Sequence, residues 1–206
     1  MTSERNPLAD AIIGLYERHA AAWADVRRSE RFIERPWIDK FAALLPPGAT
    51  VLDIGCGAGE PIARFLAGSG FAVTGVDASQ ALIDVARANL PNIDWRVGDM
   101  RALALDRTFD GLLAWHSFFH LGHDDQRGMF DVFARHAAPR AALMFTSGPE
   151  AGEALGQFEG EALYHASLDP AEYRALLAAA GFNVIEHVAH DRTTGDSTIW
   201  IAQRRG

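Results

Sequence analysis

A short apolar run followed by a glycine-rich loop is the feature of this 206-residue sequence that most restricts its possible folds. The run Val51–Ile54 has the length of a buried strand, and it leads directly into Gly55-Cys56-Gly57-Ala58-Gly59. A helix is expected from Pro61 to Ala67, and Phe71–Val76 then has the pattern of a second strand. Two strands joined through a helix in this way pair in parallel. The sequence therefore predicts a βαβ unit with a glycine loop at the carboxyl end of its first strand.

The alternation of strands and helices continues toward the C-terminus. After the second strand we expect a helix over 79–89, strands over 93–97 and 109–114, a helix over 124–137 and a strand over 141–146. A helix over 171–180 then ends at Gly181, and strands over 183–189 and 197–203 follow. The short, turn-rich link between these last two strands permits only an antiparallel pair. The pattern predicts an α/β fold, in which helices cover both faces of a mostly parallel sheet with an antiparallel last strand.

Helices are also expected ahead of the first strand. Apolar and aromatic residues at spacings of three and four predict one amphipathic helix over 8–26. A second helix, from Pro36 to Leu45, is stopped by Pro46-Pro47-Gly48. We expect a single domain, with residues 1–47 as an N-terminal helical cap and residues 48–206 as the α/β core. The segment Met1–Pro7 lacks the apolar stretch of a secretion signal.

The charge and the cysteine content of the chain restrict the binding partners and the cellular compartment to be expected. The chain has 19 Lys and Arg against 27 Asp and Glu, a net charge of −8, and no run of basic residues that could follow a phosphate backbone. No stretch approaches the length of an apolar membrane span. The single cysteine, Cys56, cannot form an internal disulfide. We therefore expect a cytoplasmic protein with no nucleic-acid or membrane partner, and the oligomeric state stays open.

Three acidic or glycine-rich positions predict a ligand site at the carboxyl edge of the sheet. The glycine loop opens a helix, whose N-terminus favours a nucleotide-like ligand. Glu60 stands where a dinucleotide fingerprint has its last glycine, which disfavours the pyrophosphate of NAD. Asp77 ends the second strand, where a carboxylate can accept both ribose hydroxyls. Asp99 follows the third strand and could accept a hydrogen bond from an exocyclic amine.

These elements, in this order and at these spacings, resemble the class I S-adenosylmethionine-dependent methyltransferase family over about Val51 to Arg204. The resemblance implies a Rossmann-like three-layer sandwich with a seven-stranded sheet, and S-adenosyl-L-methionine as cofactor. It also implies that the loop with Asp53, Gly55, Gly57 and Gly59 lies along the methionine part of the cofactor. Asp77, with the adjoining Ala78, would then bind the ribose, while Asp99 would accept from the adenine amine and Met100 would lie beside the ring.

Several aromatic and histidine side chains could lie over the transferred methyl group. The fourth strand leads into Trp115-His116-Ser117-Phe118-Phe119-His120, in which the two histidines would share a face if the segment were helical. His116 is one predicted base, and His165, in an expected long loop over 148–168, is the other. Trp115 is expected to wall the cofactor, with Tyr16 and Trp23 of the first helix closing over it.

Sequence features typical of several methyl-transfer reactions are missing here, which narrows the range of reactions to be expected. The segment after the fourth strand lacks the Asn or Asp, Pro-Pro and aromatic pattern of enzymes that methylate base amines, and Cys56 lies inside the glycine loop rather than where a nucleophile would act. Carboxylates near the fourth and fifth strands are isolated, so no metal is expected. We predict methyl transfer to an oxygen or nitrogen atom of a small molecule. Two alternatives stay open: a cofactor-binding protein without catalysis, and an NAD-dependent oxidoreductase.

Overall fold

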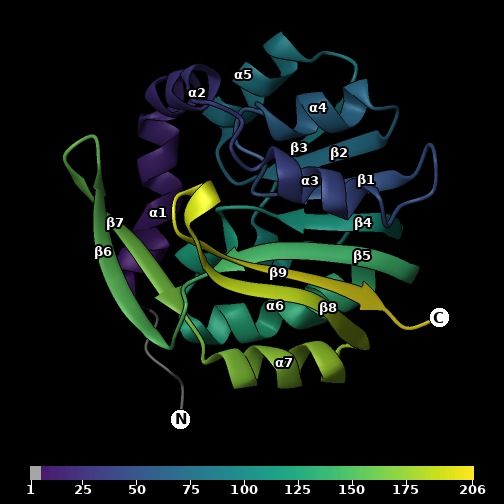
Figure 1. Cartoon of the computed structure of the whole chain (residues 1–206). Coiled ribbons are helices and arrows are strands. Elements are labelled where there is room, and N and C mark those ends of the chain that lie inside the picture. The colour runs from purple at the N-terminus through teal and green to yellow at the C-terminus, as the bar shows by residue number, and fades with distance from the viewer. Residues whose placement is uncertain (1–5) are drawn as a thin grey trace.

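The computed structural model describes residues 6–206, and it confirms the α/β fold with an antiparallel last strand (Figure 1). The main sheet has seven strands in the order β3-β2-β1-β4-β5-β9-β8. Strands β1 to β5 pair in parallel, whereas β9 runs antiparallel to both β5 and β8. The bounds are β1 Thr50–Ile54, β2 Ala72–Asp77, β3 Asp94–Val97, β4 Phe109–Ala114, β5 Ala137–Ser147, β8 Phe182–Asp191 and β9 Ser197–Arg204.

Helices cover both faces of this sheet and complete the three layers (Figure 1). They are α1 Pro7–Arg18, α2 Ala20–Ser29, α3 Arg35–Ala42, α4 Ile62–Gly68, α5 Gln80–Asn89, α6 His123–His136 and α7 Pro170–Ala179. Short 3₁₀ turns lie at η1 Met100–Ala102, η2 Phe118–His120 and η3 Arg192–Thr194. Ser79 caps α5 as expected, since its side chain accepts from the backbone N–H of Leu82. The segment Met1–Arg5, part of the stretch that is expected to lack a secretion signal, lies outside the described residues.

The two-residue period of the strands divides the interior into two cores. Leu52, Leu112 and Leu143 stand side by side in register and pack on α6 and α7. Neighbouring positions, such as Val51 and Leu113, point to the opposite face and pack on α3, α4 and α5. Because the central strands are apolar on both faces, they read as continuous hydrophobic runs in the sequence.

The single N-terminal helix predicted over 8–26 is wrong in one respect, because the chain breaks into α1 and α2 at His19. His19 has φ −110° and ψ 22°, yet its N–H still donates to Leu15 and its carbonyl still accepts from Trp23. The change of direction therefore costs few hydrogen bonds, and the apolar spacing continues through it. The His19 ring contacts Glu161 at 2.6 Å, a partner far along the chain that periodicity does not reveal.

The long loop expected over 148–168 is also wrong, because most of it forms a β-hairpin. Strands β6 Gly152–Phe158 and β7 Glu161–Ser167 pair antiparallel in a sheet of their own. Glu159 and Gly160 both have positive φ, at 51° and 80°, as two-residue hairpin turns require. Strand β7 lies beside α1 (Figure 1), and its Tyr164 and Ala166 pack with Ile12 of that helix. Strand β6 is largely exposed, which weakens the alternating pattern in the sequence.

Within residues 6–206, no helix is long and apolar enough to cross a membrane.

Candidate functional site

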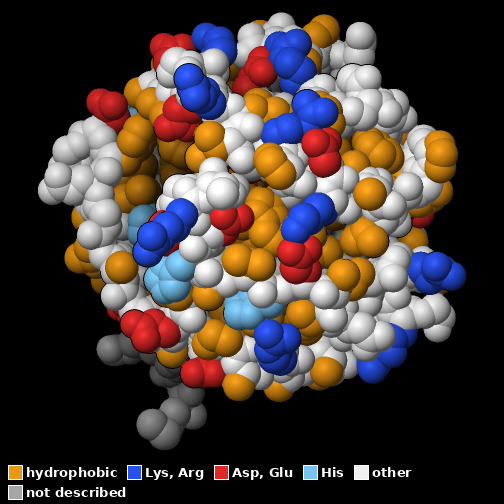
Figure 2. Space-filling model, in the orientation of Figure 1, with side chains coloured by type: hydrophobic (Ala, Val, Ile, Leu, Met, Phe, Trp, Pro, Cys, Tyr) orange, Lys and Arg blue, Asp and Glu red, His pale blue; other side chains and the backbone are white. Residues whose placement is uncertain are grey.

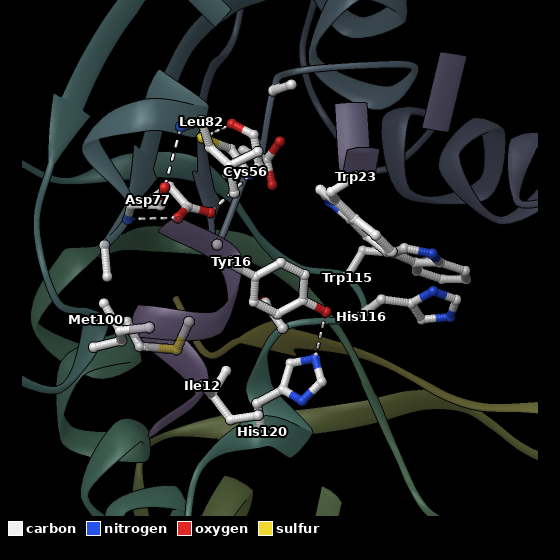
Figure 3. Close-up of a pocket in the computed structure, with 18 of the residues that line it drawn as sticks. Ile12, Tyr16, Trp23, Cys56, Asp77, Leu82, Met100, Trp115, His116 and His120 are labelled. Carbon is white, nitrogen blue, oxygen red and sulfur yellow. Dashed lines mark hydrogen bonds between the residues drawn. The ribbon is translucent and has the colours of Figure 1, made fainter. Parts of the chain in front are cut away.

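A pocket with about 1070 Å³ of empty space, part of it open to solvent, lies at the carboxyl ends of the parallel strands and beneath α1 and α2 (Figure 3). Every residue predicted to contact the cofactor lines it: Tyr16, Trp23, Asp53, Gly55, Gly57, Gly59, Asp77, Ala78, Asp99, Met100 and Trp115. The fold thus brings together positions that are spread over 100 residues of sequence.

The glycine loop is held in shape by Asp77. One carboxylate oxygen accepts from the backbone N–H of Gly57 at 2.8 Å, and the other accepts from the N–H of Ser79 at 2.9 Å. Gly55 has φ +74°, and a Cβ there would lie 2.3 Å from the Cβ of Ser117, so only glycine fits. Burial raises the pKa of Asp77. The backbone N–H of Ala78 also bonds this carboxylate, whose two oxygens together still have accepting capacity left for a hydroxyl.

Asp53 supplies a second buried carboxyl group on the pocket wall, with only 4% of its surface exposed. Burial, and to a lesser extent the charge of Asp77, raises the pKa of Asp53 to about 7, while Arg27 offsets part of the rise. A carboxyl group that is costly to ionise in isolation favours a cationic ligand group beside it. The ammonium group of an amino acid has that character.

Asp99 is part of a charged network rather than a lone acceptor. It caps η1 by accepting from the N–H of Arg101 at 2.9 Å, and it forms an ion pair with the Arg101 guanidinium at 2.6 Å. Arg101 also reaches Asp10 at 2.9 Å and Asp125 at 3.2 Å, which ties α1 and α6 to this edge of the sheet. Arg101 was not predicted from the sequence as a site residue. The side chain of Met100 lies on the same side of the pocket as Asp77 (Figure 3).

Tyr16 and His120 form a hydrogen bond of 3.1 Å across the pocket (Figure 3). His120 Nδ1 lies 2.8 Å from the carbonyl oxygen of Tyr164, which can only accept, so Nδ1 carries the hydrogen. Burial lowers the pKa of His120 to about 3, and the neutral ring therefore presents an unprotonated Nε2 to the Tyr16 hydroxyl. Tyr16 donates to His120 and keeps its own lone pairs for another group.

His116 has its tautomer fixed by a similar chain of bonds. Its Nε2 lies 3.0 Å from Ser197 Oγ, and that hydroxyl donates its hydrogen to the carbonyl of Thr194. His116 must therefore donate from Nε2, which leaves the lone pair on Nδ1. Burial, aided by Arg27, lowers the pKa of the ring to about 4. The lone pair is consequently available across the neutral pH range.

The helical face proposed for His116 and His120 does not form. His116 has φ 49°, and η2 covers only Phe118–His120. Both rings nevertheless line the pocket, because the left-handed turn and the 3₁₀ turn that follows it redirect the chain. Sequence spacing placed them on the wrong element but at the right edge of the sheet.

His165, the other predicted base, is not among the residues that line the pocket within the described chain. It stacks on His120 with ring centroids 5.0 Å apart and meets the edge of Phe119 at the same centroid distance. Burial lowers its pKa. In this position His165 supports His120 from the hairpin side.

Arg27 lines the pocket and was missed from the sequence. It lies one helical turn after Trp23, so the i+4 spacing from a predicted site residue could have revealed it. Its guanidinium pairs with Glu34, a side chain only 2% exposed. No group of three or more His, Cys, Asp or Glu side chains in residues 6–206 is arranged to hold a metal ion, and the expectation of no metal stays a prediction.

A family model described as "Methyltransferase domain" matches residues 51–140. An O-methyltransferase of Pyrenophora dematioidea is 27% identical over 187 residues, covering 82% of this chain and 69% of that protein. A dTDP-4-amino-2,3,4,6-tetradeoxy-D-glucose N,N-dimethyltransferase of Saccharopolyspora spinosa is 32% identical over 97 residues, covering 46% of this chain and 39% of the relative. The chain thus spans well under half the length of the second relative.

Among solved structures, the fold resembles 1,6-didemethyltoxoflavin-N1-methyltransferase of Burkholderia thailandensis, whose structure contains 1,6-didemethyltoxoflavin and S-adenosylhomocysteine. The TM-score is 0.76 at 18% identity, over 100% of this chain and 92% of that one. At this identity the likeness is one of fold.

Proposed function

We propose that the chain is a class I S-adenosylmethionine-dependent methyltransferase and that it transfers a methyl group from S-adenosylmethionine to an oxygen or nitrogen atom of a small molecule. The observation that carries the proposal is the joint occurrence, in one pocket, of the glycine loop with its acids and of a histidine whose unprotonated Nδ1 is fixed by hydrogen bonding. A binding protein without catalysis has no need of that histidine.

The pocket residues fit the cofactor. Positive φ at Gly55 and Gly57 lets the loop backbone approach the methionine part, and Asp53 suits its ammonium group. The free lone pairs of Asp77 suit the ribose hydroxyls, and Asp99 suits the adenine amine. When bound, S-adenosylmethionine supplies a methyl group that is activated for displacement by its sulfonium centre.

The residues around the position of the transferred methyl group can orient the acceptor and move a proton. His116 Nδ1 can take the proton from an O–H or N–H nucleophile, and the hydrogen bond to Ser197 stabilises the charge that the ring acquires. Tyr16, which already donates to His120, can accept a hydrogen bond from a second O–H or N–H group of the acceptor and orient it. Trp23, Tyr16 and Phe158 pack edge to face and exclude water from this end of the pocket.

Three observations support a small acceptor. The end of the pocket at Tyr16 and Trp23 lies against α1 and α2, and Phe158 of the hairpin packs on both of these rings. Basic and acidic side chains are interspersed on the face shown in Figure 2, without a broad patch of one sign. The two relatives carry names of an O-methyltransferase and of an N,N-dimethyltransferase of an amino sugar nucleotide, which supports either oxygen or nitrogen as the accepting atom.

We also propose that the protein acts in the cytoplasm, as its single cysteine favours.

Calorimetric titration with S-adenosylmethionine and S-adenosylhomocysteine, with NAD as the control ligand, tests the cofactor assignment. Tight binding of the first two ligands alone is the expected result, and binding of NAD alone would instead favour an oxidoreductase. Transfer of a labelled methyl group to a panel of small phenols and amines then tests catalysis. If the cofactor binds but no labelled product forms, and His116→Asn leaves slow cofactor hydrolysis unchanged, the binding-protein alternative gains support.

A further inference from the structure

The outer edge of the hairpin strand β6 has no part in the function proposed above. The two-residue turn makes Phe158 and Glu161 the first hydrogen-bonded pair of the hairpin, and such pairs alternate along the two strands. The backbone N–H and C=O groups of Glu153, Leu155 and Gln157 therefore point away from β7. Within residues 6–206, no hydrogen bond joins these backbone groups to another part of the chain. In Figure 1, β6 forms the left border of the molecule, and β7 lies between it and α1.

The other edge of the hairpin, along β7, is closed by side chains. Tyr164 and Ala166 also point their carbonyl groups outward, since they face Leu155 and Glu153 in the ladder. These two carbonyls accept hydrogen bonds from the side chains of His120 and Gln126, each at 2.8 Å. The hairpin therefore has one edge that the rest of the fold occupies and one that stays open.

The two edges of the seven-stranded sheet also differ from β6. At one edge, β3 has only four residues, and its Asp94 and Arg96 form an ion pair. At the other edge, the ladder of β8 shifts its register twice, first between Val184 and Glu186. Short, charged and bulged edge strands resist pairing with another chain. Strand β6 has seven residues in unbroken register and contains no Lys, Arg or Pro, so it has none of these protections.

Leu155 lies at the centre of this open edge. With 62% of its surface exposed, it is the most exposed of the large hydrophobic side chains in residues 6–206. Its neighbours along the strand, Ala154 and Gly156, are small and leave the edge accessible to another strand. An exposed, regular and apolar strand edge is a template for pairing with a further strand.

The residues along β6 are complementary to themselves. A two-fold axis between two copies of the chain pairs this strand with itself in the antiparallel direction. With the axis at Leu155, that residue faces the partner's Leu155, and Glu153 faces the partner's Gln157, so every outward-pointing residue is paired. An axis at Glu153 would instead set two carboxylates opposite each other, which destabilises a strand pair. Charge therefore favours the register centred on Leu155.

We propose that β6 pairs with β6 of a second copy of this chain around a two-fold axis at Leu155, which joins the two hairpins into one continuous antiparallel sheet. Main-chain hydrogen bonds supply the affinity, and the two leucine side chains add an apolar contact across the axis. This pairing is independent of the proposed methyl transfer. It stabilises the hairpin that also supports the pocket, because the carbonyl of Tyr164 accepts from His120.

Sedimentation equilibrium of the full chain tests the pairing. We expect reversible association to a species of twice 22.4 kDa as the protein concentration rises from about 1 to 100 µM. Leu155→Pro removes an N–H that the hairpin itself does not use, and it should weaken the dimer at least tenfold. Leu155→Thr keeps the N–H and suits a strand, so it should weaken the dimer by no more than about threefold. If Leu155→Pro fails to fold, Leu155→Lys replaces it, because it sets two ammonium groups opposite each other at the axis.

Two cysteine variants test the register. Residues opposite each other in a hydrogen-bonded antiparallel pair have Cα atoms about 5.5 Å apart, which a disulfide can span. Leu155→Cys should therefore give a disulfide-linked dimer under mild oxidation. Gln157→Cys should not, because its two copies would lie about 14 Å apart. The unaltered protein, with Cys56 as its single thiol, is the control for linkage through that residue.

Charge variants at Gln157 test the same register from the side of affinity. Gln157→Lys sets an ammonium group opposite the partner's Glu153, and Gln157→Glu sets a carboxylate there. We expect the first variant to strengthen the dimer and the second to weaken it, each by roughly fivefold.

The possible outcomes are distinct. A chain that stays monomeric at every concentration, and whose Leu155→Cys variant forms no linked dimer, overturns the pairing. A dimer that is equally strong in the unaltered protein and in Leu155→Pro or Leu155→Lys lies on another surface and also overturns it. Equal linkage in Leu155→Cys and Gln157→Cys overturns the two-fold axis at Leu155. Association that weakens in Leu155→Pro, with linkage confined to Leu155→Cys, supports the pairing in the stated register.

Discussion

The pocket has a nucleoside end, at Asp77 and Asp99, and an aromatic end, at Tyr16, His116 and His120, and the contacts that form them span very different distances along the chain. At the nucleoside end, Asp77 ends β2 and Asp99 lies just beyond the adjacent strand β3. Both carboxylates accept backbone N–H groups within 20 residues of themselves. At the aromatic end, Tyr16 bonds His120 across 104 residues, and His116 bonds Ser197 across 81. The nucleoside end is therefore a local construction, while the aromatic end exists only after the N-terminal helices, the hairpin and the last strand pair have packed together.

This difference suggests that one end of the pocket binds the cofactor and the other recognises the acceptor. Hydrogen bonds between a carboxylate and nearby backbone N–H groups form wherever the same loop and strand ends occur, which suits a cofactor shared by a whole family. Contacts between distant segments can change with any of those segments, which suits recognition of an individual acceptor. We expect substitutions at the two ends to separate binding of the cofactor from the chemical step, and the variants below test that expectation.

The largest effect is expected for His116→Asn. Loss of a general base lowers kcat by roughly 100-fold to 10,000-fold, while the affinity for S-adenosylhomocysteine should change by less than about twofold. Because the pKa of His116 is about 4, kcat at saturating cofactor should stay level from pH 8 down to pH 6. Initial rates of labelled methyl transfer measure both. An active His116→Asn enzyme would remove this residue from the chemistry.

Asp77→Ala should act on binding. It removes the acceptor for the ribose and releases the N–H groups of Gly57 and Ser79, so the affinity for S-adenosylhomocysteine should fall more than tenfold, or by more than about 1.4 kcal/mol. Asp84→Asn, which changes an exposed carboxylate on the following helix α5, is the control and should bind normally. Unchanged affinity in Asp77→Ala, measured by calorimetry, would contradict the assignment of the nucleoside end.

Asp53 should make cofactor binding depend on pH. Its folded-state pKa of about 7 means that the carboxylate is mostly ionised at pH 8 and mostly protonated at pH 6. Binding of a cationic ammonium should therefore weaken roughly fivefold to tenfold from pH 8 to pH 6, and Asp53→Asn should abolish this dependence. Calorimetry of S-adenosylhomocysteine at both pH values provides the measurement. A pH dependence that persists in Asp53→Asn would assign it to another group.

The same shift has a consequence for the ligand-free protein. An acid with a raised folded-state pKa holds its proton more tightly in the folded protein than in the unfolded chain. The stabilisation from the protonated Asp53 is fully present below the unfolded pKa of about 4 and is lost as the pH rises through about 7. Asp53→Asn should flatten this part of the stability curve, as measured by urea unfolding between pH 5 and pH 8.

The smallest effect is expected for His165→Asn. The ring lies outside the pocket lining and stacks on His120, so kcat should fall by no more than about threefold through a small shift of His120 and Tyr16. Rates measured beside those of His116→Asn make the comparison direct. A loss of kcat as large as that in His116→Asn would instead identify His165 as the general base and contradict the proposed separation between the two ends of the pocket.

Parts of the site could be predicted because their signal is local. Ser79 caps α5, and the acids at 77 and 99 stand directly after strands, so strand assignment alone places them at the ligand edge. The hairpin could not be predicted in the same way, because β6 is mostly exposed and carries little apolar alternation. Glu159-Gly160 was its best signal, and the pair becomes informative only when both flanking segments are taken as strands.

The sequence by itself determined the βαβ unit, the glycine loop, the acids beyond β2 and β3 and the antiparallel last strand. Each of these follows from residue period, turn chemistry or connection length, which act over a few neighbouring residues. Only the tertiary structure decided that His116 faces the pocket while His165 stacks behind His120, which nitrogen of each ring carries a hydrogen, and that Trp115 keeps an unpaired N–H. Those outcomes depend on hydrogen bonds and burial between segments far apart in the chain, and a residue pattern contains no record of which distant partner will supply them.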